Sequence, residues 1–501
     1  MKRAVIAAVC LGGLLGATAS ARGGDVPVTG GRGAEPDPAQ RDRSTVNRRL
    51  EAMFARGDYE SAHRLLEQAL QSRPRDHLMR YNLACTLAML GRTDEAETAL
   101  TDAISFGFVD FAAMERDAHL ASLRSTSTFR AILRGWGELL EERRAADLRV
   151  MQEFFEGSYT YEQDESLRLQ FASALEAGSL EAARREIRRV AVWWDEHFGA
   201  ASPGANPDRP EPWVSVVLPT PTDFFRLIRA DGVGGTYDRT VKRLIAQDIG
   251  ATLRHEFVHV LHWRQLVHLG QEHPLWIMEG IASLVEDVEL GEEDRLVIVP
   301  SWRTNIVKRL EARNGLMKWD QFFRLDQRRF MTVRPRAMYA QARAVFMFME
   351  ARGVLPQWYR EYVKGFDQDP TGLSALELVF GADATTVERQ FREWVRTLPE
   401  VAEVGRPGEA GLGVAVGPGS GDGPVVESSG RAAAGQAGER LRRRDVVESV
   451  DGTPTRNLDD LYRVLGGYDV GDQVAVQVRR GTRRLEIQLQ LVGPDRVPQQ
   501  P

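Results

Sequence analysis

The chain has 501 residues, of which 27% are charged and 43% hydrophobic, and a formal net charge of −6 at pH 7. This length supports several domains. A mildly acidic chain has no electrostatic reason to bind nucleic acid, so nucleic-acid partners are excluded from the expected functions.

Residues 1–21 have the composition of a secretory signal peptide. Lys2 and Arg3 form a charged start, an apolar run follows, and residues 19–21 (ASA) form a small-residue cleavage site. The apolar run is shorter than the ~20 residues needed to cross a membrane. We therefore expect an exported protein, periplasmic or secreted, without a membrane span. Cleavage leaves Cys85 as the remaining cysteine, so no intramolecular disulfide is expected.

Residues 22–44 are rich in Gly, Pro, Asp and Arg and lack apolar periodicity, which predicts a disordered linker. Residues 45–145 are predicted to be helical and contain an internal repeat with a period of 34 residues. Segment 57–70, GDYESAHRLLEQAL, aligns without a gap with segment 91–104, GRTDEAETALTDAI. A looser third helix pair is expected over residues 118–136.

The period and the small-residue positions of this segment resemble those of tetratricopeptide repeats, in which paired helices stack. Two interpretations of so short an array stay open. The array either presents a docking surface to a peptide or protein partner, or forms a structural cap that packs on the next domain.

Residues 150–400 are predicted to form a further folded domain. A long amphipathic helical region is expected over Leu167–Phe198, strands over Trp213–Leu218 and Val241–Gln247, and further helices over Met338–Trp394.

The central motif of this domain is His255-Glu256-Phe257-Val258-His259, an H-E-x-x-H sequence set in a run with helical apolar spacing. Residues four apart lie one turn above each other, so both imidazoles can bind one metal ion while Glu256 faces a metal-bound water. Chance alone produces such a motif in roughly one chain in a hundred of this length. The third ligand therefore decides whether the motif is a metal site.

A second helix is predicted to supply that ligand. Gly270 is a helix stop and Pro274 can open the next helix, which contains the segment 276–282, WIMEGIA. Glu279 stands twenty residues after His259, far enough for the chain to reverse and present a carboxylate.

H-E-F-V-H followed by W-I-M-E-G-I-A resembles the gluzincin metallopeptidases of the thermolysin-like clan, and is especially similar to the peptidase MA-like group. The resemblance implies an α+β thermolysin-like zincin domain. It assigns His255, His259 and Glu279 as ligands of one Zn²⁺ and Glu256 as the general base.

The resemblance also suggests supporting roles. Thermolysin-like members place an acid four residues beyond the ligand glutamate, whereas this chain has Ser283 there, so the role of orienting a zinc histidine is assigned to Glu286. Gluzincins hold the oxyanion with a Tyr or His from the closing helical half, which nominates Tyr339. The alternative for Tyr339 is packing at a helix start.

Two further expectations follow from zincins in general. The strand that leads into the active helix is often a sheet edge that can pair with an extended peptide, which assigns this role to residues 241–247. His262, His268 and His273 match no ligand position of the family, and we expect them to form local hydrogen bonds or line the cleft.

Residues 405–495 resemble a PDZ domain. Leu412, Gly413 and Val414 correspond to the carboxylate-binding loop, residues 458–465 to the groove-lining helix, and residues 474–491 to the last hairpin. The resemblance implies capture of a peptide C-terminus by backbone N–H groups with strand addition. The glycine-rich insertion 417–423 departs from compact members of the family.

The expected fold is thus multidomain and mainly α, with a helical repeat array, an α+β zincin domain and a small β-rich domain. The expected function is hydrolysis of peptide bonds by an exported zinc metallopeptidase. Two alternatives stay open: a gluzincin of the glycyl aminopeptidase type, and a catalytically inactive zincin scaffold that binds peptides through its repeats and PDZ domain.

Overall fold

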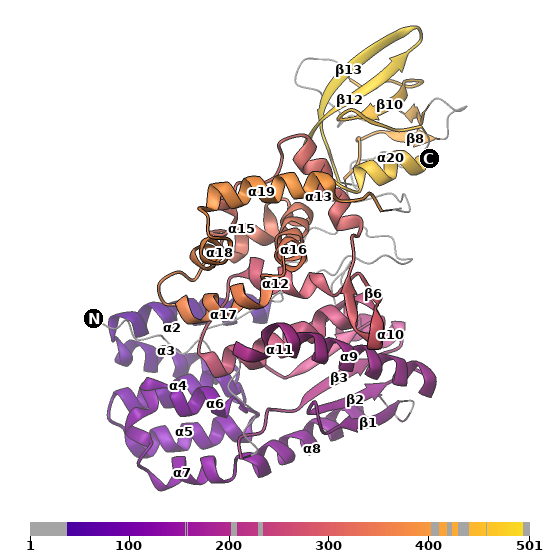
Figure 1. Cartoon of the computed structure of the whole chain (residues 1–501). Helices are drawn as coiled ribbons and strands as arrows, with labels where there is room; N and C mark the ends of the chain where they lie inside the picture. The colour runs from indigo at the N-terminus through magenta and orange to yellow at the C-terminus, as the bar shows by residue number, and fades with distance from the viewer. Residues whose placement is uncertain are drawn as a thin grey trace. The chain divides into compact units, whose positions relative to one another are not determined.

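A computed structural model describes residues 38–493 apart from residues 156, 158, 202–207, 229–233, 402–409, 418–422, 429–439 and 457 (Figure 1). Within the described part, the chain divides into two compact units between residues 273 and 274. The predicted signal peptide and residues 22–37 of the predicted linker lie outside the described residues.

The first unit begins with a set of short helices. They are α2 (Pro38–Arg56), α3 (Tyr59–Ser72), α4 (His77–Met89), α5 (Thr93–Ser105), α6 (Phe111–Arg116), the 3₁₀ helix η1 (Ala118–Leu123), α7 (Ser127–Arg134) and α8 (Trp136–Phe155). Gly57 and Gly91, one repeat apart, have φ angles of 69° and 74° and follow α2 and α4. Only glycine adopts this conformation at no steric cost, which explains its recurrence.

The linker prediction is wrong for residues 38–44, which belong to α2. Proline fits the first turn of a helix because its missing N–H has no helical partner there, and no glycine lies between Pro38 and Arg56. The core of the helical segment is continuous from α2 to α8, and Tyr81 stacks on Phe108 within it, with ring centroids 4.2 Å apart.

A five-stranded sheet follows in the same unit. Its strands are β1 (Thr160–Asp164), β2 (Leu169–Ser173), β3 (Val214–Leu218), β4 (Gly235–Asp238) and β5 (Arg243–Ala246), in the order β1-β2-β3-β5-β4. Strands β2, β3 and β5 run parallel, and β1 and β4 pair antiparallel at the two ends. The two predicted strands of this region are confirmed as β3 and β5.

Two sequence-based expectations for this sheet are wrong. The helix predicted over residues 167–198 is helical only over α9 (Ala177–Phe198), because the five residues of β2 are all buried between neighbouring strands. Strand β5 lies inside the sheet, and β4 forms the edge instead. The short β4 pairs antiparallel with β5 and thereby covers the edge that was assigned to residues 241–247.

Helices cover both faces of the sheet. Residues Ala172, Val217 and Ile245 pack in one cluster with Met151 and Phe155 of α8. Helices α9 and α11 (Ala251–Leu269) lie on the opposite face (Figure 1). The unit also contains α10 (Pro221–Leu227) and the 3₁₀ helix η2 (Gly199–Ala201). Because side chains alternate along a strand, the sheet can bury apolar residues against both helical layers.

The second unit begins with helices around an aromatic core. They are α12 (Leu275–Leu284), α13 (Trp302–Ala312), α14 (Trp319–Phe322), α15 (Gln327–Thr332), α16 (Pro335–Ala351), α17 (Leu355–Gly365), α18 (Leu373–Phe380) and α19 (Ala384–Thr397). A hairpin of β6 (Val288–Leu290) and β7 (Leu296–Ile298), joined by the 3₁₀ helix η3 (Glu292–Asp294), interrupts them. The helices predicted over residues 338–394 are confirmed.

The rest of this unit is rich in β-structure. It contains β8 (Ala415–Gly417), β9 (Val425–Ser428), β10 (Val446–Val450), β11 (Thr453–Pro454), α20 (Leu458–Leu465), β12 (Gln473–Arg480) and β13 (Arg483–Gln490). The sheet order is β13-β12-β10-β9-β8, with β11 paired to β10. The helix α20 and the last hairpin occupy the predicted residues. The order of structure along the chain, helical repeats followed by mixed helix and sheet and then by a β-rich segment, also agrees with the prediction.

None of the helices in the described part of the chain combines the length and the apolar character that crossing a membrane requires.

Candidate metal centre

Helix α11 carries the H-E-x-x-H motif in a buried setting. Asp248 stabilises the N-terminal end of the helix. One of its carboxylate oxygens accepts a hydrogen bond from the Gly250 amide at 2.8 Å, and the other accepts one from the Thr252 hydroxyl at 2.5 Å. The helix ends at Gly270, whose φ of 68° confirms the predicted stop. Between these ends, His255, Glu256 and His259 all have side chains removed from solvent.

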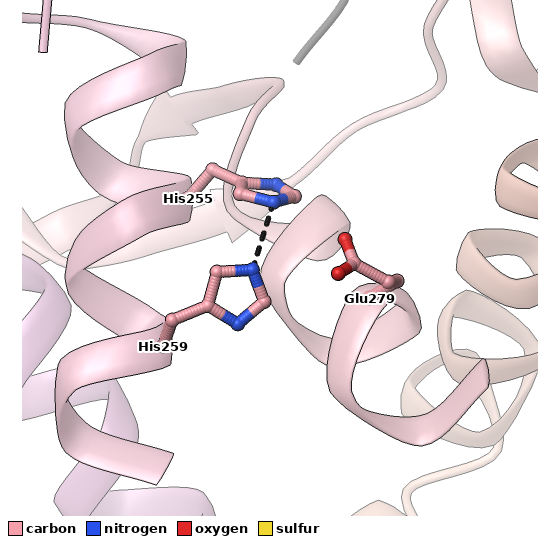
Figure 2. Close-up of side chains that lie close together, drawn as sticks. All are labelled: His255, His259 and Glu279. Carbon is pink, nitrogen blue, oxygen red and sulfur yellow. Dashed lines mark hydrogen bonds between the residues drawn. The ribbon is translucent and has the colours of Figure 1, made fainter. Parts of the chain in front are cut away.

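The two histidines converge as the four-residue spacing predicts. Their Nε2 atoms lie 3.1 Å apart, and the rings meet edge to face with centroids 4.8 Å apart (Figure 2). His255 is 0% and His259 is 2% exposed. Buried nitrogens of this kind need a hydrogen-bond partner or a metal.

Glu279 of α12 completes the cluster. It is 0% exposed, and its carboxylate faces the two imidazoles (Figure 2). One ligand atom from each of His255, His259 and Glu279 lies within 4.8 Å of the others. Ligand atoms around a tetrahedral Zn²⁺, bound at about 2.0–2.2 Å, are separated by roughly 3.3–3.6 Å. The two imidazole nitrogens, 3.1 Å apart, are close to this separation, and two imidazoles with one carboxylate are donors that Zn²⁺ accepts, so these residues fit the ion.

The sequence W-x-x-E-G of α12 has a packing explanation. A Cβ atom on Gly280 would lie 2.5 Å from Cδ2 of Phe346 and 3.1 Å from the carbonyl oxygen of Ala342, both on α16. Trp276 stacks on the same Phe346 ring, with centroids 5.2 Å apart. The glycine therefore lets α12 lie against α16, and this contact fixes the helix turn that carries Glu279.

Arg343 of α16 holds the other end of α12. It is 0% exposed and donates hydrogen bonds to the carbonyl oxygens of Ser283 at 2.9 Å and Val299 at 2.8 Å. Burial lowers the pKa of Arg343, and the nearby carboxylates of Asp287 and Glu286 oppose this effect. The guanidinium thus satisfies a carbonyl group at the C-terminal end of α12, where the helix dipole favours a cation.

Glu256 lies against the edge strand of the sheet. A Cβ atom on Gly235 of β4 would lie 3.1 Å from Cγ of Glu256, 2.6 Å from Cγ2 of Thr252 and 2.7 Å from the carbonyl oxygen of Ile245. Only a glycine at this position allows β4 to approach α11 so closely. The general base predicted from the sequence therefore packs directly against the backbone of β4.

The two supporting residues predicted from the resemblance have other partners. Both carboxylate oxygens of Glu286 accept hydrogen bonds at 2.9 Å from Arg303, and this pair is almost fully buried. The pairing does not support the histidine-orienting role assigned to Glu286. The hydroxyl of Tyr339 lies 3.4 Å from Sδ of Met331, and its ring packs on Phe330. The oxyanion role of Tyr339 stays a prediction.

The remaining histidines of the region form local contacts. His262 Nε2 and His273 Nδ1 lie 2.8 Å apart in the interior. Burial, reinforced by the charge of His259, lowers the pKa of His262 to about 3. Burial likewise holds the pKa of His273 well below its ordinary value. His268 pairs with Glu211. These contacts are of the local kind expected from the sequence.

The predicted carboxylate-binding loop is placed beside a sheet edge. Leu412 and Val414 are 3% and 5% exposed and belong to the apolar core of the β-rich segment, and Gly413 has a φ of 70°. The loop leads directly into β8, the last strand of the sheet path. Because its two larger side chains are buried, the loop can offer a ligand mainly its backbone.

Sequence reasoning missed Gly235 and Arg343. A single arginine within AQARAVFMFM, an otherwise apolar helical run, was a readable signal for a buried cation. Gly235 had no such signal, because its role depends on which strand lies beside α11.

Comparisons with known proteins agree with part of this picture. The sequence profile of the tetratricopeptide repeat matches residues 53–110, which confirms the predicted repeats. A stretch of 76 residues is 36% identical to protease Do-like 1, chloroplastic, of Arabidopsis thaliana, and covers 13% of this chain and 17% of that protein. The chain therefore spans about a sixth of that relative's length.

Among solved structures, an aminopeptidase N family protein from Idiomarina loihiensis is similar over 68% of this chain and 67% of its own, with 12% identity and a TM-score of 0.28. At this score the similarity carries no argument about fold or function.

Proposed function

We propose that this protein is an exported zinc metallopeptidase of the gluzincin type, related to the peptidase MA-like group. The observation that carries the proposal is the buried cluster of His255, His259 and Glu279, whose ligand atoms lie within 4.8 Å of one another. Similarity of a short stretch to a protein named a protease supports the same class of activity. In this proposal residues 1–21 direct export, and residues 150–400 form the zincin domain.

The residues of the cluster divide the chemistry between them. His255 and His259 would hold the metal through ring nitrogens, and Glu279 would add a carboxylate whose negative charge offsets part of the charge of the ion. Bound zinc would supply a coordinated water with a pKa near 7 and polarise the scissile carbonyl. Glu256 accepts the proton of the attacking water and then gives it to the leaving amine. Burial of all four side chains excludes bulk water from this transfer.

Substrate binding is proposed at two sheet edges. Strand β4 lies at the edge of the first sheet and contacts Glu256 through Gly235, so an extended peptide paired with it would lie beside the general base. Residues 405–495 are proposed to be a PDZ domain, in which the backbone of residues 412–414 and the edge strand β8 bind a peptide C-terminus.

The decisive test is Glu256→Gln, which preserves size and removes the base. We expect the variant to bind zinc at the wild-type stoichiometry and to lose about 10²–10⁴-fold in turnover of a blocked peptide library. Metal content and hydrolysis are measured on the same preparation. Wild-type turnover in Glu256→Gln would disprove the general-base assignment.

The ligand set is tested by Glu279→Ala. Removal of one of three protein ligands should lower zinc affinity and turnover together, as measured by competition with a chromogenic chelator. Glu289→Ala, on the exposed β6, is the matched control and should bind zinc like the wild type. Full zinc affinity in Glu279→Ala would exclude Glu279 as a ligand.

The alternatives are separated by substrate form. A gluzincin of the glycyl aminopeptidase type requires a free amino terminus and would not cleave N-acetylated peptides. An inactive scaffold would bind peptides at the loop of residues 412–414 and cleave none, whether blocked or free.

A further inference from the structure

The helical repeats and the sheet meet at the turn that joins β4 to β5, residues 238–242. His77, the first residue of α4, places Nε2 3.1 Å from the carbonyl oxygen of Thr240. Asp110, which precedes α6, forms an ion pair with Lys242: its Oδ2 accepts a hydrogen bond from Nζ at 3.0 Å, and its Oδ1 lies 2.8 Å from Nζ. Both contacts connect the repeats to this turn across more than a hundred residues of sequence.

Lys242 is an unusual residue for its position. It is 6% exposed, and its φ of 51° places a residue with a side chain in the left-handed region. Lysine is almost never buried unless it is paired, and a left-handed conformation normally favours glycine. The contacts of the Nζ atom compensate for the buried charge and for the strained backbone: Nζ donates to Asp110 and, at 2.7 Å, to the carbonyl oxygen of Arg239.

These contacts organise the whole turn. The backbone of Lys242 accepts a hydrogen bond from the Ser215 amide of β3 at 2.8 Å, which fixes the entry to β5. Arg239, held by Lys242 at its carbonyl group, lies over the Trp263 ring of α11 at 4.1 Å. Lys242 therefore links the repeats, the turn and the sheet. The turn also contacts α11, through Arg239 and Trp263.

The strand held by this turn is the one that touches the general base. Strand β4 runs from Gly235 to Asp238 and ends at the turn, and the backbone at Gly235 packs against Cγ of Glu256. The turn and this contact are therefore separated by the four residues of β4, so a displacement of the turn would shift the backbone at Gly235. Strand β4 pairs with β5 on one side only, so it depends on its turn for its position.

We propose that the helical repeats of residues 45–145 position the edge strand β4 against Glu256, and that the buried Lys242–Asp110 pair is the contact that does so. Lys242 and Asp110 are thus positioning residues for the reaction, and this face of the repeats belongs to the catalytic domain. The inference rests on the proposed peptidase function for its kinetic consequence, but the positioning of β4 can be measured without it.

The test is Lys242→Met in the full mature chain, which keeps the length of the side chain and removes its charge. We expect faster hydrogen exchange of the backbone amides in residues 235–246. We also expect kcat to fall about 10-fold or more, since small displacements of a catalytic group have large effects on rate, while zinc content stays at the wild-type level. Asp110→Asn should give the same changes, and the double variant should lose no more than either single one.

The control is Arg209→Met. Arg209 also joins the helical segment to the sheet segment, through an ion pair with Glu115 at 2.9 Å and a position over the Trp136 ring, and neither partner belongs to the turn or to β4. Its removal should leave exchange in residues 235–246 and kcat unchanged. Equal effects of Arg209→Met and Lys242→Met would overturn the proposal, because general loosening of the packing would then explain both.

Two other outcomes are decisive. Unchanged exchange and unchanged kcat in Lys242→Met would also overturn the proposal. If the wild type cleaves no peptide, the proposed peptidase function fails, and exchange in residues 235–246 alone then decides whether the repeats position β4. Should Lys242→Met fail to fold by circular dichroism, Lys242→Arg, which keeps the charge, replaces it. Its amide exchange in residues 235–246 should be faster than in the wild type and slower than in Asp110→Asn.

Discussion

At the scale of single residues, the candidate centre is defined by polar side chains placed where apolar ones are expected. His255 and Glu279 are 0% exposed and His259 is 2% exposed, in helices whose other buried residues are mostly apolar. Burial of a carboxylate and two imidazoles without compensation is costly. A bound divalent cation would reduce that cost, since it would replace the lost hydration of all three groups.

Asp117 is a buried carboxyl group of the repeats, and its contribution to stability is expected to depend on pH. Burial by itself would raise the pKa of Asp117, but hydrogen bonds from the side chain and backbone of His119 and from the hydroxyl of Tyr81 outweigh this effect. They leave the pKa of Asp117 below its ordinary value. A carboxyl group with a lowered folded-state pKa adds stability that is present above its unfolded-state pKa, and this stability is lost as the pH falls through the folded-state pKa.

Asp117→Asn should therefore lower the free energy of unfolding of the protein near pH 7, by about 1–3 kcal/mol for a charged buried hydrogen-bond acceptor. The difference from the wild type should shrink as the pH falls below about 4, where the unfolded carboxyl group protonates. Urea denaturation of both proteins between pH 3 and pH 7 measures it. A difference that does not change with pH would show that the Asp117 charge contributes nothing.

At the scale of elements, the close packing of α12 on α16 positions Glu279. Gly280 permits the contact, Trp276 fills the space beside it, and Arg343 donates a hydrogen bond to the carbonyl oxygen of Ser283 at the end of α12. These residues explain the segment W-x-x-E-G by packing, without a direct role in chemistry for the tryptophan or the glycine.

Gly280→Ala tests this packing. The added methyl group would lie 2.5 Å from the Phe346 ring, so α12 must shift and carry Glu279 with it. We expect destabilisation by about 1–3 kcal/mol, as is usual for overpacking, and weaker zinc binding in a chelator competition assay.

The matched control is Gly178→Ala in α9, where no atom lies within 4 Å of the added carbon. This change should stabilise the protein slightly, by up to about 1 kcal/mol, because alanine favours the helix. Zinc affinity equal to the wild type in Gly280→Ala would mean that the α12–α16 contact does not position the ligand.

At the scale of the whole molecule, zinc binding should stabilise the folded chain. A ligand that binds only the folded state adds about 2.7 kcal/mol when its free concentration is 100 times its Kd. Removal of the metal with a chelator should therefore lower Tm by several degrees, and added Zn²⁺ should restore it. Differential scanning calorimetry measures both steps.

His259→Ala provides the control for metal removal, since this variant lacks one of the ligands. Its Tm should already be low and should not respond to chelator. A wild-type Tm that is insensitive to chelation, in protein shown to contain one zinc, would contradict the coupling of the metal to the fold.

The local features of this protein could be predicted from its residues alone. The glycine-punctuated period of 34 residues predicted the repeats, and the four-residue spacing in α11 predicted two converging imidazoles. Glu279 could be nominated because only residues 270–274 separate α12 from α11, so Glu279 is close in sequence to the two histidines. Helical periodicity and helix ends depend on short-range geometry, which a sequence displays directly.

Features that depend on residues far apart in the chain could be identified only after folding was known. Residues 169–173 form a strand because they lie between β1 and β3, and β4 is the edge because it pairs with the outer side of β5. The contacts of Gly235 with Glu256, of Gly280 with Phe346 and of Lys242 with Asp110 join residues from different elements. The pairing of surfaces depends on how the whole chain packs, and a local sequence pattern does not contain that information.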